Sequence, residues 1–143
     1  MRFMLLMYPG PQDEVAGMIP SEKDIAPMME FNEELTKSGA LLSLDGLHPS
    51  ASGARVRYRG GKTTVVDGPF TEAKEIVGGY WMIQVKSREE AIEWAKKVPA
   101  ADGEMVEIRR VSEMSEFNLD PASEITKQAE RVGAGLEANQ KKA

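Results

Sequence analysis

Two short segments of this chain are apolar on both of the alternating side-chain sets that a β-strand presents. Phe3–Tyr8 contains only apolar and aromatic residues, and Tyr80–Val85 departs from that pattern only at Gln84. Successive side chains of a strand point to opposite faces, so both faces of these two segments must be covered. The sequence therefore predicts a sheet in which these segments are the two central strands.

Two other segments have the apolar spacing of packing helices. The first is expected over Ile25–Ser38, with Asp24 as its N-cap and Pro27 in its first turn. The second is expected to begin at the capping box Ser87–Glu90 and to be closed by Pro99.

Further strands are expected on both sides of the second central strand. The two-residue turn Gly60-Gly61 is typical of a β-hairpin, and Gln12–Pro20 is expected to be a polar connection. The element order predicts an α+β fold, a ferredoxin-like βαββαβ unit with an inserted hairpin. These strands are predicted at Leu41–Leu47, Ala54–Arg59, Lys62–Asp67 and Met105–Val111.

Two helices can cover only one face of such a sheet. Because the central strands are apolar on the second face as well, we expect that face to pack on a second copy of the chain. This predicts a homodimer, with a domain at 1–118 and a weakly helical or dimer-docking tail at 119–143.

Composition narrows the class of function. The 143 residues include no cysteine and one histidine, and the net charge is −5. These values give no general attraction for nucleic acid and exclude thiolate sites. No segment is apolar for long enough to span a membrane. We expect a cytoplasmic protein that needs no metal or cofactor and has itself and a small molecule as partners.

The turn after the hairpin is the first candidate site. Asp67 ends a β-type run, and Gly68, Pro69 and Phe70 follow it. A carboxylate held at a strand end beside an aromatic ring can act as a general base or anchor a polar ligand. The alternative is an Asx-type turn, in which the Asp67 carboxylate accepts hydrogen bonds from the N–H groups of the following loop.

His48 is the one side chain suited to moving protons near neutral pH, and it is the predicted catalytic partner of Asp67; the alternative is an idle, exposed imidazole. Tyr8, Trp81 and Phe70 could form an aromatic binding pocket or could simply be core residues. Arg109 could contact a ligand or pair with Glu107.

The spacing of several short motifs resembles that of the YCII-related, or DGPF-domain, proteins. The matching residues are Val66–Phe70, Lys74-Glu75, Gly78–Tyr80 and Val106–Arg109, and the likeness covers about Met1 to Val111. The resemblance implies a dimeric α/β barrel. It also implies either a small-molecule site with cofactor-free proton transfer or a regulatory module, which in some relatives is associated with sigma factors.

One position departs from that family. Relatives thought to be enzymes carry a histidine in the first helix, paired with an aspartate, and the corresponding position here is near Met28. A thioether cannot transfer protons, so the resemblance does not by itself imply that dyad's chemistry.

Overall fold

A computed structural model describes residues 1–10 and 20–143. The chain forms two compact units, Met1–Val111 and Ser112–Ala143. The polar connection expected at 12–20 falls, apart from Pro20, outside the described residues.

The first unit is built on a four-stranded antiparallel sheet. Its strands are β1 (Arg2–Tyr8), β2 (Leu41–Gly46), β5 (Gly79–Gln84) and β6 (Met105–Arg110), in the order β2-β5-β1-β6. The two doubly apolar segments are the central strands, as predicted. The predicted α+β class is confirmed, and the strand order is compatible with a ferredoxin-like fold.

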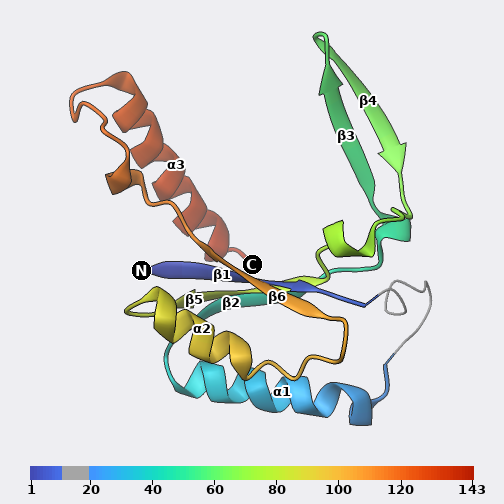
Figure 1. Ribbon diagram of the computed structural model, residues 1–143. Coiled ribbons are helices and arrows are strands. Elements are labelled where there is room, and N and C mark those ends of the chain that lie inside the picture. The colour runs from blue at the N-terminus through green and yellow to red at the C-terminus, as the bar shows by residue number, and fades with distance from the viewer. Residues whose placement is uncertain (11–19) are drawn as a thin grey trace. The chain divides into compact units, whose positions relative to one another are not determined.

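Two helices of this unit, α1 (Glu22–Lys37) and α2 (Arg88–Lys96), lie on the same face of the sheet (Figure 1). The core forms between them and the sheet, and Leu5, Leu35 and Ile83 are fully buried. The Phe31 ring meets the Trp81 ring edge to face, with centroids 5.6 Å apart. We call the other face of the sheet the open face. Its side chains include Met4, Leu6, Tyr8, Tyr80 and Met82.

Helix α1 begins earlier than the sequence predicted. Ser21, not Asp24, is the N-cap: its hydroxyl oxygen accepts the Asp24 N–H at 3.4 Å, and the Asp24 carboxylate accepts the Ser21 N–H at 3.0 Å. This is a capping box, so Asp24 is the third helical residue and Pro27 lies beyond the first turn. The Ser21 hydrogen bonds lower the pKa of Asp24.

Helix α2 begins at the predicted cap, but half of the predicted capping box is different. The Ser87 hydroxyl accepts the Glu90 N–H at 3.1 Å, as expected. The Glu90 carboxylate instead accepts the N–H of Lys86, at 2.8 Å. The carboxylate therefore fixes the residue before the cap rather than the cap itself.

Strands β3 (Ala54–Arg59) and β4 (Lys62–Asp67) form their own two-stranded sheet, separate from the four-stranded one (Figure 1). Both turn residues, Gly60 and Gly61, have positive φ, 59° and 72°. Two consecutive positive φ values suit the right-handed twist of a hairpin and favour glycine at both positions.

The second unit contains a short 3₁₀ turn, η4 (Met114–Glu116), and helix α3 (Glu124–Gln140). Ser123 caps α3 by accepting the Thr126 N–H at 3.2 Å. Ile125, Val132 and Leu136 are more than half exposed. Within the described ranges, neither this helix nor any other combines the length and apolar character of a membrane span.

Candidate functional site

The Asp67–Phe70 turn is fastened to a short 3₁₀ turn, η2 (Ser50–Ser52). The Gly68 N–H donates to the Gly53 carbonyl at 2.9 Å, and the Phe70 N–H donates to the Ser50 hydroxyl at 3.0 Å. A Cβ on Gly68 would lie 1.7 Å from the Ser50 carbonyl oxygen. Glycine is required here because the two backbones touch.

The Phe70 ring also supports the hairpin. The Arg55 guanidinium carbon lies 3.9 Å from the ring centroid, which is cation–π geometry. Arg55 therefore packs against the turn instead of extending into solvent. Gly68 and Phe70 thus hold the base of the hairpin in place, and Pro69 between them is exposed.

Asp67 itself is exposed. Among the described residues its carboxylate has no hydrogen-bond partner, and the first two N–H groups after it bond to Gly53 and Ser50. The alternative of an Asx-type turn is therefore wrong: within the described part of the chain, the Asp67 carboxylate accepts no N–H group of the following loop.

His48 is exposed as well, and no hydrogen bond or ion pair joins it to Asp67. The two predicted catalytic side chains are not brought together within the described part of this chain.

The three predicted aromatic residues do not share a pocket. Trp81 pairs with Leu5 and is buried on the helix-covered face, where it belongs to the core. Tyr8, three residues beyond Leu5, lies on the open face. Phe70 lies at the hairpin base under Arg55. Trp81 is thus a core residue, and its predicted role in ligand binding stays a prediction.

Tyr8 forms part of a small polar network on the open face. Its hydroxyl donates to Glu107 at 3.2 Å, and Arg109 donates to the same carboxylate at 3.1 Å. The ion pair that was one alternative for Arg109 is thus present. Desolvation, and next the Glu107 charge, raise the pKa of Tyr8.

A cavity of about 180 Å³ lies between α1 and the facing ends of β2 and β5; we call it the α1 pocket. Its apolar wall includes Met28 and Trp81. Residues that line it include Met28, Asn32, Leu44, Asp45, Tyr80 and Trp81.

The α1 pocket contains an oriented amide. The indole N–H of Trp81 donates to the Asn32 side chain at 2.8 Å. Because an indole nitrogen is only a donor, the group that it meets must be the amide oxygen. The Asn32 NH₂ group is consequently left as a donor, and it has no partner among the described residues.

A second oriented group, the Asp45 carboxylate, lies beside the pocket but on the open face of the sheet, because Asp45 pairs with Tyr80 and Tyr80 pairs with Leu6. The Tyr80 hydroxyl donates to Asp45 at 2.9 Å, and this hydrogen bond is the largest cause of the raised pKa of Tyr80. Strands β2 and β5 approach closely here, since a Cβ on Gly79 would lie 2.9 Å from the Asp45 carbonyl oxygen. The Asp45 carboxylate and the Asn32 amide therefore lie on opposite faces of the sheet.

Asn32 and Asp45 were missed from the sequence. Asn32 lies within the apolar pattern of a helix, where a single amide has no distinguishing signal. Asp45-Gly46 looked like an interruption of a strand. A signal was available, because Asp45 also ends a β-type run, as Asp67 does.

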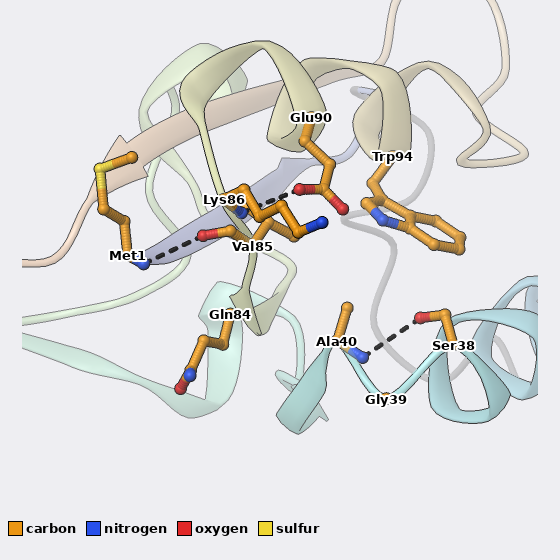
Figure 2. Close-up of a pocket in the computed structure, with 9 residues that line it drawn as sticks. All are labelled: Met1, Ser38, Gly39, Ala40, Gln84, Val85, Lys86, Glu90 and Trp94. Carbon is orange, nitrogen blue, oxygen red and sulfur yellow. Dashed lines mark hydrogen bonds between the residues drawn. The ribbon is translucent and has the colours of Figure 1, made fainter.

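A second cavity, of about 370 Å³, lies near the end of α1 and the start of α2 (Figure 2). Two of the polar side chains that Figure 2 shows are bonded to local backbone: Glu90 to the Lys86 N–H, and the Ser38 hydroxyl oxygen to the Ala40 N–H. The Gln84 amide and the Lys86 ammonium also line this cavity. Across residues 1–10 and 20–143, no group of three or more His, Asp or Glu side chains is placed to hold a metal ion.

Comparison with known proteins gives one family. An uncharacterized protein of Rhizobium meliloti (strain 1021) is 30% identical over 81 residues, which are 57% of this chain and 65% of that protein. The chain thus aligns with somewhat less than two thirds of the relative. The family model for the YCII-related domain matches residues 1–115, which include the whole first unit. The chain therefore belongs to the YCII-related domain family.

Proposed function

We propose that the first unit binds a small molecule in the α1 pocket. The observation that carries this proposal is an oriented polar group, the Asn32 amide, at a mainly apolar cavity. A few fixed polar groups in a mainly apolar recess are typical of ligand sites. Trp81 holds the amide in place, so little ordering is needed when a ligand binds.

The lining defines the ligand's chemistry. The free Asn32 NH₂ group requires an acceptor such as a carbonyl. Met28, Leu44 and the Trp81 ring favour an apolar or aromatic body beside that group. A volume of about 180 Å³ is below the roughly 300–1,000 Å³ of ordinary ligand pockets, so the ligand is small.

Binding is tested by native mass spectrometry of protein taken rapidly from lysate, followed by calorimetry with any compound that copurifies. Asn32→Leu should weaken affinity about tenfold or more, because it leaves a ligand polar group unpaired. Asp67→Asn is the control, since Asp67 does not line this pocket. If Asp67→Asn weakens binding and Asn32→Leu does not, the site lies at the hairpin base.

Cofactor-free proton transfer at Asp67, with His48 as its partner, is a separate proposal. Its support is that no hydrogen bond among the described residues occupies the Asp67 carboxylate, which is thus free to accept a proton. Turnover that is abolished by Asp67→Asn and by His48→Gln would support it. Turnover that survives both changes would rule it out.

We also propose that the chain functions as a homodimer of the dimeric α/β barrel type, in which the open face meets its equivalent. Met4, Leu6 and Met82 give that face an apolar centre, and α1 and α2 both lie on the other face (Figure 1). Met82→Glu should dissociate the dimer in analytical ultracentrifugation, because a charge would be buried against apolar side chains. An unchanged dimer would argue against this interface.

A regulatory or accessory module without catalysis is the alternative function. The observation that favours it is Met28, which places a side chain that cannot titrate at the cavity where a histidine would be expected. Under this alternative the ligand would change affinity for a protein partner without being converted. Recovery of the copurified compound unchanged after long incubation would favour the module over the enzyme.

A further inference from the structure

The β3–β4 hairpin has two chemically different faces. Residues that pair directly across an antiparallel ladder share a face. The basic face, as we define it, carries Arg55, Arg57, Arg59 and Lys62; the apolar face carries Val56, Tyr58 and Val65. These three apolar-face residues are 48%, 80% and 64% exposed. Arg57, Arg59 and Lys62 have no ion-pair partner within the described parts of the chain.

A hairpin of this kind is expected to need a further packing partner to be stable. A two-stranded sheet is marginally stable in water, and the apolar face exposes on the order of 300 Å². That area is well below the roughly 800 Å² per partner of a stable interface. The hairpin is therefore better suited to be one part of a larger contact than an independent docking site. The outer edges of β3 and β4 are also unpaired in this structure.

A second unpaired edge belongs to strand β2, which is the outermost strand of the four-stranded sheet and pairs only with β5 in this structure. A groove of about 590 Å³ runs between β2 and α1, with Met29 and Leu44 as apolar lining and Glu30 and Glu33 as acidic lining. Met29 is 59% exposed and Leu44 36%. An uncovered strand edge beside an apolar groove is a site for strand addition.

The charges of the two surfaces are opposite. Residues 54–67 carry four basic side chains and one acidic, a net charge of +3. Helix α1 carries five acidic side chains and two basic, a net charge of −3. In a chain whose overall charge is −5, the hairpin is a local concentration of positive charge, and α1 is an acidic surface that complements it.

We propose that β3 of a second copy adds to the outer edge of β2, so that the hairpin of each copy extends the sheet of the other. Both strands are six residues long. One orientation of the added strand places the basic face on the α1 side, against Glu30 and Glu33. The same orientation aligns the apolar face with the open face of the sheet. A single placement thus accounts for both faces of the hairpin.

The added hairpin would also border the α1 pocket. Asn32 and Leu44 line both the groove and the pocket, so a strand seated in the groove forms an outer wall for the ligand site. The strand exchange does not depend on the proposed small-molecule function. It can be tested in protein without ligand.

Cross-linking tests the contact directly, because the chain has no cysteine of its own. Met29→Cys and Arg57→Cys copies, one carrying a size tag, are mixed and treated with a short bis-maleimide. A linked heterodimer is expected in the mixture, and none is expected when Asp102→Cys, an exposed position of the first unit outside the groove lining, replaces either variant. Only contacts between two copies can link these single variants.

Three outcomes would overturn the proposal. Linkage of Arg57→Cys copies to one another, with none to Met29→Cys copies, would show that hairpins pair with hairpins. A link formed only within one chain, in the double variant, would show that the hairpin docks on its own sheet. The absence of any link would show that the groove is not the hairpin's site.

Charge exchange provides the second measurement. Arg57→Glu and Glu30→Lys should each weaken dimerisation about fivefold, as expected for one partly exposed ion pair, and the combined variant should recover most of the loss. Asp102→Lys, an exposed change away from the groove, is the control. Additive losses in the combined variant, measured by sedimentation equilibrium, would contradict the pairing of these surfaces.

Discussion

Gly68→Ala tests whether the Asp67–Phe70 turn is a structural lock. The new Cβ would lie 1.7 Å from the Ser50 carbonyl oxygen, whereas ordinary contact begins at about 3.4 Å. The two backbones must separate by more than 1 Å in response, which is enough to break hydrogen bonds of 2.9 and 3.0 Å. At about 0.5–1.5 kcal/mol for each bond, we expect a loss of about 1–3 kcal/mol.

Gly53→Ala is the matched control for Gly68→Ala. Its Cβ would lie 3.4 Å from the same Ser50 oxygen, an ordinary contact, so the expected loss of stability is small. Urea denaturation followed by circular dichroism measures both variants, and hydrogen exchange at the Phe70 amide reports the local bond. The reasoning is refuted if the two variants are equally stable and the Phe70 amide stays protected in both.

Three further changes test the pocket and the core. Asp45→Asn removes the carboxylate whose hydrogen bond raises the pKa of Tyr80, so the tyrosinate absorbance of the variant should appear at lower pH. In the natural chain, the stabilisation from this hydrogen bond is present below pH 10.0 and is lost as the pH rises through the folded-state pKa of Tyr80. Trp81→Phe removes the 2.8 Å bond to Asn32 and should cost about 1–3 kcal/mol in urea denaturation; an unchanged midpoint would show that the bond does not stabilise the fold. Leu5→Ala, at a fully buried position, should cost about 2–5 kcal/mol in the same assay, and a loss below 1 kcal/mol would contradict tight packing there.

The order of the elements was accessible from the sequence because each central strand is apolar on both faces. No other position in a two-layer domain tolerates that pattern, so β1 and β5 were placed in the middle of the sheet without knowledge of any contact. Helix starts were less accessible. Ser21 and Asp24 both favour an N-cap, and only the reciprocal bonds of the capping box show that Ser21 is the cap.

The site was harder to predict because a pocket is a property of side chains that meet from distant segments. Asp67 has local features that suggest a function, yet it is exposed and separate from the cavity. Asp45 has weaker local features, but its pairing with β5 brings it to Tyr80, 35 residues away. Asn32 is oriented by Trp81, 49 residues away, and no local pattern records that bond.

The Trp81–Asn32 bond also gives this protein a built-in optical signal. Trp81 lines the α1 pocket, and Trp94 is the only other tryptophan. In a Trp94→Phe background, the tryptophan fluorescence of the chain would come from one indole, whose N–H donates to the Asn32 amide at the pocket. Filling the pocket would displace water beside that ring and shift its emission. A library of small molecules could therefore be screened without a label and without knowledge of any reaction.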